Sequence, residues 1–592
     1  MYNLKECHHL RPLRTAKQLF ELMRRKQATA SACAKEHSGA VTHRLPDGPD
    51  FQYFLSHGRL APTAGPVAAH CSSGHGIRVF FEIHGCQMNT SDAEVVWSVL
   101  QKEGYIKVDK ISLASIVLIM TCAIRESAEH KIWERLDYFK QRRRKEASAN
   151  NERLKVGLLG CMAERLKDKI LDKEKMVDVI AGPDSYRDLP RLLRQVESGQ
   201  AAVNTLLSKE ETYADIVPVH LTNSPTTAFV SIQRGCDNFC SFCIVPFVRG
   251  KERSRPVGSI LNEVKALRDQ GIREVTLLGQ NVNSYCDATE RSISTCHPPS
   301  GLISGFRTLY KPKVGGLRFV ELLEQVSNID PELRIRFQSP HPKDFPDEVI
   351  QLMRDRPNIC KQLHLPAQSG SSQVLKAMRR GYTRQVYLDL VHRIRSIIPP
   401  IAFTSDFIAG FCGETEEAHK ETLTLLKEVG YAFVYAYPYS MRPGTSADKR
   451  LEDNVSPADK NRRFKEVTST FRDVALKLNQ KQIGSRHLVL VEGDSKRSSS
   501  QLQGRADSGT KVIFPKVAGI SRGGSSNSKV EYAAPQPGDY VEVLVQEASS
   551  QTLYADAVCL SSIQDFAARD RQTARRERDL PVVETHTAVP SN

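Results

Sequence analysis

Three cysteines lie close together at a spacing that suits a metal cluster. Cys236, Cys240 and Cys243 form a CxxxCxxC pattern, with Phe242 directly before the third cysteine. Three thiolates on one loop can hold three irons of a [4Fe–4S] cluster and leave the fourth iron open. A structural zinc site normally closes with a fourth protein ligand, and none lies nearby in the sequence. We expect an iron–sulfur cluster; three structural or zinc-binding cysteines are the alternative.

A second group of cysteines is dispersed along the chain. Cys86, Cys122 and Cys161 each come just after a short apolar segment that is typical of a buried parallel strand. The carboxyl ends of parallel strands meet at one edge of a sheet, so the three thiols can converge on one metal site. Each could equally be an inert buried thiol, because free cysteine behaves as a small apolar side chain.

The segments around the dispersed cysteines predict the first domain. Strands are expected at 79–83, 116–120 and 156–159, and helices follow them at 91–103, 124–142 and 163–173. This alternation is typical of α/β proteins. We therefore predict an open parallel α/β sheet over residues 78–215.

A longer α/β series follows over residues 222–455. Its candidate strands are 229–233, 274–278, 334–337, 362–365, 402–408 and 433–437. Six βα units predict a partial or complete parallel barrel, in which chemistry is carried at the carboxyl ends of the strands. The polar stretch 285–316 is too long for an ordinary connection and is predicted to be an exposed insertion.

The two ends of the chain have a different character. A helical connector at 456–483 leads to a small all-β region at 484–562, and the arginine-rich residues 563–592 predict a disordered tail. Residues 1–77 contain a basic amphipathic stretch that resembles a mitochondrial targeting segment. A disordered basic tail is the alternative for that stretch.

Composition excludes several classes of protein. The chain of 592 residues has no apolar run near the ~18 residues that a membrane helix needs. Its 14 cysteines are too sparse for a disulfide scaffold, which indicates a reducing compartment. The formal net charge of +15 is compatible with a polyanionic partner but does not establish one.

Together these features resemble the methylthiotransferase family of radical S-adenosylmethionine enzymes, over roughly residues 78–560. The motifs that carry the resemblance are Gly85-Cys86-Gln-Met-Asn89, Thr121-Cys122-Ala-Ile-Arg125, Gly160-Cys161-Met-Ala-Glu-Arg165, Arg234-Gly235-Cys236, Leu278-Gly-Gln-Asn-Val-Asn283, His364-Leu-Pro-Ala-Gln-Ser-Gly370 and Gly410-Phe-Cys-Gly-Glu-Thr415. The resemblance implies an N-terminal open α/β domain, a radical SAM (βα)6 partial barrel and an RNA-binding TRAM domain.

The resemblance also implies cofactors and a reaction. Cys236, Cys240 and Cys243 would hold the [4Fe–4S] cluster that binds S-adenosylmethionine, and the dispersed triad would hold an auxiliary [4Fe–4S] cluster. A 5′-deoxyadenosyl radical would remove hydrogen from adenine C2, and a methylthio group would replace it. The implied substrate is N6-isopentenyladenosine beside the anticodon of a tRNA. We also expect an external electron donor, a monomeric chain and a mitochondrial location, with the cytoplasm as a further compartment.

Polar residues near the expected strand ends are candidates for cofactor or substrate contact, and no catalytic group beyond the cluster ligands is expected. These candidates are Gln280, Asn281, Gln368, Asp406 and Glu414. Hydrogen bonds that order the barrel rim are the alternative for each. Candidate phosphate contacts are Arg379, Arg380, Arg505 and Lys511. A solvated charged face is the usual alternative for such residues.

Other functions fit the same motifs. A methylthiotransferase of this family could act on threonylcarbamoyl-adenosine in tRNA or on an aspartate of a ribosomal protein. A non-enzymatic alternative is a protein that binds and inhibits a kinase activator subunit, with the clusters as structural supports. Substitution of Cys236 separates the classes, because catalysis needs this residue and simple binding does not.

Overall fold

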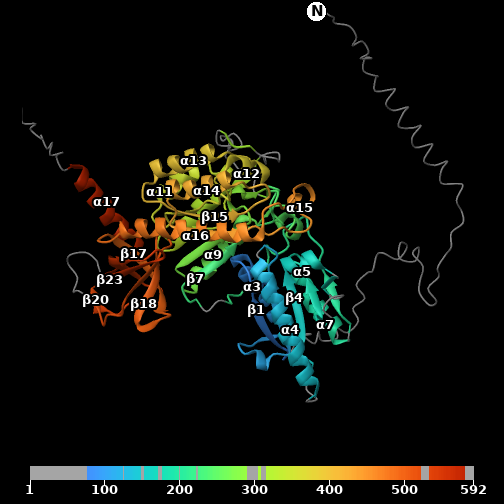
Figure 1. The fold of residues 1–592 in the computed structure, drawn as a ribbon. Helices are drawn as coiled ribbons and strands as arrows, with labels where there is room; N and C mark the ends of the chain where they lie inside the picture. The colour runs from blue at the N-terminus through green and yellow to red at the C-terminus, as the bar shows by residue number, and fades with distance from the viewer. Residues whose placement is uncertain are drawn as a thin grey trace, which may run out of the picture. The chain divides into compact units, whose positions relative to one another are not determined.

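The computed structural model describes residues 76–124, 126–148, 153–167, 169–170, 176–198, 200–221, 224–289, 305–307, 315–521 and 532–579. Almost all of the predicted targeting segment, most of the insertion and the end of the chain lie outside these residues. Within them, the chain forms an N-terminal α/β domain, a central α/β domain and a small β-barrel (Figure 1).

The N-terminal domain is built on one parallel sheet of order β2-β1-β3-β4-β5-β6. Its elements are β1 Arg78–Ile83, α3 Gln87–Lys102, β2 Ile106–Lys107, β3 Ile116–Thr121, α4 Glu126–Ser148, β4 Lys155–Gly160, α5 Cys161–Leu166, β5 Val179–Ala181, α7 Leu189–Glu197 and β6 Ala202–Asn204. Strand β3 is buried on both faces: Val117 and Ile119 pack in one apolar cluster, and Leu118 and Met120 pack in another. The predicted open parallel sheet is confirmed.

The central domain has six parallel strands that follow one another in chain order. They are β7 Thr227–Ser231, β10 Glu274–Leu278, β13 Arg334–Phe337, β14 Gln362–His364, β15 Ala402–Ala409 and β16 Phe433–Pro438. The covering helices are α9 Val257–Asp269, α10 Phe319–Ser327, α11 Asp347–Asp355, α13 Arg384–Ile397 and α14 Glu416–Val429. The strands form two three-stranded sheets, β7-β10-β13 and β14-β15-β16. The prediction of a partial barrel is confirmed, with its ladder interrupted between β13 and β14.

Short elements complete the central domain. They are β8 Gln233–Arg234, α8 Val245–Val248, β9 Arg253–Ser254, β11 Cys286–Asp287, β12 Leu317–Arg318, α12 Ser372–Ala377 and α15 Ser446–Arg450. Strands β11 and β12 pair in antiparallel fashion and bring together the two ends of the predicted insertion. The insertion therefore leaves and re-enters the domain at one place.

The C-terminal domain is a closed five-stranded barrel of order β17-β18-β19-β23-β22. Helix α16 Pro457–Gln480 leads to its strands β17 Arg486–Ser495, β18 Ser498–Ala506, β19 Lys511–Pro515, β22 Tyr540–Ala548 and β23 Thr552–Ser561, beside a small hairpin of β20 Ile520–Ser521 and β21 Tyr532–Ala533. Alternate strand residues fill the interior with an apolar cluster that includes Val489, Phe514 and Val543.

Two arginines of β13 attach the barrel to the central domain. Arg334 donates to two carbonyl oxygens of the barrel backbone at 2.6 and 2.8 Å, and Arg336 donates to two more, both at 2.9 Å. The four acceptors belong to Leu488, Arg505, Ala506 and Asp507. Both arginines are buried, so this attachment is shielded from water.

The segment after the barrel differs from its prediction. Where the sequence predicts a disordered tail, Ile563–Asp579 forms helix α17. The side chain of Ile563 packs against Leu488, Leu490 and Tyr540 of the barrel, and Arg569 donates to Glu542 at 2.6 Å. These contacts anchor a segment whose composition alone resembles a solvated tail. Among the described helices, none has the length and apolar character needed to cross a membrane.

Candidate active site

The dispersed cysteines follow three strands that lie side by side. Cys86 caps the start of α3 after β1, Cys122 comes directly after β3, and Cys161 begins α5 directly after β4. The sheet order β1-β3-β4 places their ends at one edge. Gly85 has a φ of +105°, and a Cβ there would lie 2.6 Å from the Cβ of Cys122. A glycine is therefore required for the chain to pass this close to the second cysteine.

Two polar side chains hold these strand ends together. The amide of Asn89 donates to the carbonyl of His84 at 2.6 Å and to that of Thr121 at 3.0 Å. The hydroxyl of Thr121 donates to the carbonyl of Leu159 at 2.7 Å and accepts from the N–H of Met162 at 3.2 Å. These bonds join the turns that carry all three cysteines, so the triad is held by its neighbours before any metal binds.

The clustered cysteines lie on the loop after β8. Gly235 has a φ of +76°, and a Cβ there would lie 2.0 Å from the carbonyl oxygen of Lys251. Its N–H donates to Oε1 of Gln280 at 2.6 Å. The N–H of Cys243 donates to the carbonyl of Cys240 at 3.0 Å, which turns the loop back on itself. Phe242 packs edge-on against Phe411.

The two cysteine triads share a packed wall. Ala123 and Cys161 from the N-terminal domain form one apolar cluster with Ile244 and Val248 from the central domain. Ile244 directly follows Cys243 in the sequence. The short helix α8 that begins after Ile244 lies against α5. The structure thus brings the neighbourhood of one triad into contact with the other.

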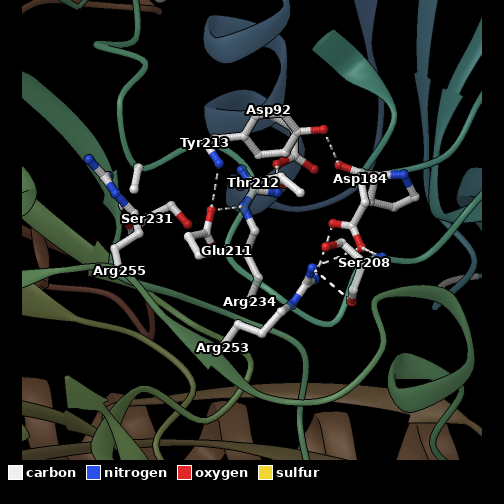
Figure 2. A network of polar contacts seen from close by, with 12 residues as sticks. Asp92, Asp184, Ser208, Glu211, Thr212, Tyr213, Ser231, Arg234, Arg253 and Arg255 are labelled. Atoms are coloured by element: carbon white, nitrogen blue, oxygen red, sulfur yellow. Dashed lines mark hydrogen bonds and ion pairs between the residues drawn. The ribbon is translucent and has the colours of Figure 1, made fainter. Parts of the chain in front are cut away.

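Buried ion pairs cross the same junction between the domains (Figure 2). Asp92 of α3 accepts from Arg234 at 2.6 Å and from Arg249 at 2.7 Å. In Figure 2, Arg253 points toward Asp184 and Ser208, and its guanidinium donates to the two Asp184 oxygens at 2.9 and 3.1 Å. Such pairs require close fit on both sides, because a buried charge without its partner is costly. They therefore fix the two domains against each other at the triads.

The cysteines fit iron–sulfur clusters in their chemistry. Burial raises the pKa of Cys161 to about 12 against the opposing charge of Arg249, and burial likewise raises the pKa of Cys243 to about 12. Burial also raises the pKa of Cys236 well above its ordinary value. Metal must displace these protons to bind the thiolates. No three His, Cys, Asp or Glu within the described ranges lie close enough to hold one metal ion, whereas a cluster takes each thiolate on a different iron.

The five predicted contact residues have different surroundings. Gln280 orders the Gly235 turn, as described above. Asn281 is buried and donates to Asp344 at 3.0 Å. Glu414 is buried and accepts from Arg463 at 3.0 Å. Asp406 and Gln368 are only partly buried; Asp406 lies 3.3 Å from a ring nitrogen of His364, and Gln368 has a φ of +69°.

The four predicted phosphate contacts also differ in how far they are exposed to water. Arg379 is exposed, and Arg505 and Lys511 face each other in register on β18 and β19. Arg380 is only 5% exposed and donates to Sγ of Cys240 at 3.3 Å and to the carbonyl of Pro366 at 2.9 Å. The prediction of a phosphate contact for Arg380 is corrected accordingly, since its guanidinium is directed into the protein.

Two residues of the site were not identified from the sequence. Arg249 lies six residues after Cys243 and contacts Cys161. Phe239 lies between two of the clustered cysteines, is 44% exposed and has a φ of +47°. The signal in the sequence that could have identified them is the presence of an arginine and an aromatic residue close to a CxxxCxxC pattern.

Comparison with known proteins identifies the family. Residues 230–426 match the Radical SAM superfamily, residues 78–182 the uncharacterized protein family UPF0004, and residues 480–558 the TRAM domain. The chain is 52% identical to mitochondrial tRNA methylthiotransferase CDK5RAP1 of Mus musculus over 551 residues, 91% of this chain and 92% of the relative. The chain belongs to the radical S-adenosylmethionine methylthiotransferase family.

More distant relatives carry related names. The tRNA-2-methylthio-N(6)-dimethylallyladenosine synthase of Chloroherpeton thalassium is 44% identical over 481 residues, 81% of this chain and 96% of the relative. The radical S-adenosylmethionine methyltransferase TsrM of Kitasatospora setae aligns with a TM-score of 0.44 at 13% identity, over 63% of this chain and 74% of the other. Membership of the Radical SAM superfamily gives this chain S-adenosylmethionine and a [4Fe–4S] cluster as cofactors.

Proposed function

We propose that this chain converts N6-isopentenyladenosine beside the anticodon of mitochondrial tRNAs into its 2-methylthio derivative. The contact between the two cysteine triads carries the proposal. Methylthiolation needs a radical and a sulfur at one carbon of the substrate, and Cys161 packs against the residues that follow Cys243. The names of the mouse and Chloroherpeton relatives support the tRNA substrate and the isopentenyl (dimethylallyl) group.

Each triad has its own proposed role. Cys236, Cys240 and Cys243 would hold the cluster that binds S-adenosylmethionine, and Cys86, Cys122 and Cys161 would hold the auxiliary cluster. When bound, these groups supply the radical that removes hydrogen from adenine C2 and the methylated sulfur that replaces it. The protein orients the two triads through the buried pairs of Asp92 and Asp184 and keeps water from the cysteines, most of which are buried.

The proposal extends to partners and location. Arg379, Arg505 and Lys511 are the proposed phosphate contacts for the anticodon stem-loop, because arginines and lysines dominate such contacts. Gln368, which follows β14 and pairs with Phe407 of β15, and Asp406 within β15 are partly buried and are the proposed contacts for cofactor or substrate. An external electron donor reduces the chain, which acts as a monomer. The name of the mouse relative supports mitochondria as its location; a cytoplasmic pool is the further alternative.

The first test is analysis of tRNA nucleosides by mass spectrometry. Cells that lack this activity would receive the native chain, Cys236→Ala, Cys161→Ala or the control Cys559→Ala, whose thiol lies in the barrel on β23. We expect 2-methylthio-N6-isopentenyladenosine with the native chain and the control, and only N6-isopentenyladenosine with the two triad variants. Normal modification by Cys236→Ala would exclude catalysis by this cluster and favour binding of a kinase activator.

The second test counts metal. Anaerobically purified protein should contain about eight irons per chain, two [4Fe–4S] clusters. Cys161→Ala should reduce this to about four. A native chain with only about four irons would exclude the auxiliary cluster.

Accumulation of a methylthio group on threonylcarbamoyl-adenosine or on a ribosomal protein, with none on isopentenyladenosine, would instead replace the proposed substrate.

A further inference from the structure

Each cysteine triad has one buried arginine that donates to a cysteine sulfur. Nε of Arg249 lies 3.1 Å from Sγ of Cys161, and Nη1 of Arg380 lies 3.3 Å from Sγ of Cys240. Both arginines are nearly inaccessible to water, at 2% and 5% exposed. A buried guanidinium needs a partner for its charge, and in each case a proposed cluster ligand is one of its acceptors.

Arg249 reaches its sulfur from the other domain. It follows α8, which starts just after Cys243, and Cys161 lies in the N-terminal domain. Its Nη2 is held by Asp92 at 2.7 Å and by Oδ1 of Asn89 at 3.3 Å. The same Asn89 amide bonds to the turns that carry the dispersed cysteines. The direction of the Nε–H toward Cys161 is therefore set by two contacts of Nη2, with Asp92 and with Asn89.

One nitrogen of the Arg249 guanidinium makes no hydrogen bond that is described. Its Nη1 is buried and has no hydrogen-bond partner in the part of the chain that is described. Buried polar atoms without partners are uncommon and call for a physical explanation. A [4Fe–4S] cluster on Cys86, Cys122 and Cys161 would offer sulfur acceptors to this guanidinium.

We propose that Arg249 is a positioning residue that raises the reduction potential of the auxiliary cluster by donating to the Cys161 sulfur, an inference that rests on the proposed function above. Hydrogen bonds to cluster sulfurs and nearby charge are the means by which proteins set these potentials. The reduced cluster carries one more negative charge than the oxidised cluster. A fixed cation with its N–H on the sulfur stabilises the reduced form more, so the potential rises.

The test isolates the auxiliary cluster in the full-length chain. A parent variant with Cys236, Cys240 and Cys243 all changed to Ala retains only the dispersed triad and should bind about four irons. Its potential is measured by anaerobic redox titration followed by electron paramagnetic resonance. Arg249→Met in this parent should lower the potential and change the resonance spectrum. Arg249→Lys keeps the cation without the fixed Nε–H, so its potential should lie between the two.

Arg253→Met is the matched control. Arg253 is an equally buried arginine at the same junction, paired with Asp184, and none of its described hydrogen bonds is to sulfur. It should weaken the junction without shifting the potential. A potential unchanged in Arg249→Met at full iron content, or a shift as large in Arg253→Met, would overturn the proposal and leave Arg249 a structural brace.

The outcomes also separate this inference from the proposed function. A parent that binds no iron would remove the auxiliary cluster itself and, with it, the role of Arg249. A parent with about four irons and a potential insensitive to Arg249 would overturn the arginine's role alone. In the chain with all six cysteines, Arg380→Met should shift the potential of the other cluster and spare that of the auxiliary cluster.

Discussion

The carboxylate of Asp92 and the guanidinium of Arg234 meet 2.6 Å apart, with their side chains 0% and 2% exposed. Arg249 shares the same carboxylate, so one aspartate of the N-terminal domain holds two arginines of the central domain. The charges of Arg234 and Arg249 hold the pKa of Asp92 below its usual range although burial acts to raise it. This residue therefore connects the alignment of the two domains to the cysteine triads beside it.

Asp92→Ala should destabilise the N-terminal domain by about 3–5 kcal/mol, because it leaves buried charges without their partner. Both tryptophans of the chain, Trp97 and Trp133, lie in this domain, so their fluorescence during urea denaturation follows it selectively. Asp215→Ala is the control. It removes an exposed pair with Arg187 and should cost about 1 kcal/mol or less. Equal urea midpoints for the two variants would contradict the prediction.

Stability should fall as pH rises through the titration of Glu164. Burial raises the pKa of Glu164 from 4.5 to about 7, partly opposed by the charge of Lys167. The folded state therefore binds more protons than the unfolded state between these values, and the free energy of unfolding decreases as pH rises across this window. Glu164→Gln should be close to the native chain near pH 5 and more stable by on the order of 1–2 kcal/mol near pH 8.

Urea titrations of tryptophan fluorescence at the two pH values measure this difference. Glu210→Gln changes an exposed glutamate and serves as the control for loss of one carboxylate at the surface. A Glu164→Gln variant whose advantage is the same at both pH values would show that burial does not control this carboxyl.

Phe239 should contact the substrate base. It is an exposed aromatic between two proposed cluster ligands, with a φ of +47° that costs energy for a residue with a side chain. Such strain persists mainly at functional sites, and a base stacked on an aromatic ring gains ~1–3 kcal/mol. Phe239→Leu should raise the KM for tRNA about tenfold, and Phe239→Tyr should retain most of the activity.

Steady-state kinetics with a tRNA substrate test this contact, and iron content must stay at the native value in both variants. Tyr138→Leu, which changes a similarly exposed aromatic of α4, should leave KM unchanged. Equal KM values for Phe239→Leu and the native chain would contradict this contact. The left-handed backbone of Phe239 would then serve only the turn of its loop.

Arg505 and Lys511 should contribute to tRNA affinity through phosphate contacts. They are partners in register on adjacent strands of the barrel. Changing both to Gln should weaken binding and reduce the slope of log affinity against log salt by about 1.4, roughly 0.7 for each lost contact. Filter binding over a range of salt concentrations measures the slope. Lys265→Gln on α9, which removes one lysine outside the barrel, is the control. A salt slope of the double variant equal to that of this control would exclude the two phosphate contacts.

The parts of the fold that could be predicted are those where local pattern and burial agree. Strand β3 is a continuous apolar run because both of its faces are covered, and β10 was predicted at its observed bounds, Glu274–Leu278. The positions of the cysteines followed from these strands, since parallel strands deliver their ends to one edge. The sequence predicts these elements because the conformation and burial of each residue follow from the pattern of its own segment.

The remaining elements depend on distant partners. Strand β18 reads Ser498–Ala506, with mostly polar residues, and forms because both of its neighbours in the barrel supply hydrogen bonds. Arg249 and Arg380 are by residue type expected at the surface, yet both are buried by contacts with residues 88 to 160 positions away. Nothing in their own segments indicates those partners.

Part of the attachment of the barrel to the central domain runs through backbone carbonyl oxygens of the barrel and not through its side chains. Arg334 and Arg336 donate to four backbone acceptors, and every amino acid offers that acceptor. At these contacts, docking is thus insensitive to which side chains the barrel displays. Substitutions of exposed side chains of the barrel therefore leave these four hydrogen bonds in place, so its outer surface can change in evolution while this part of the attachment is kept.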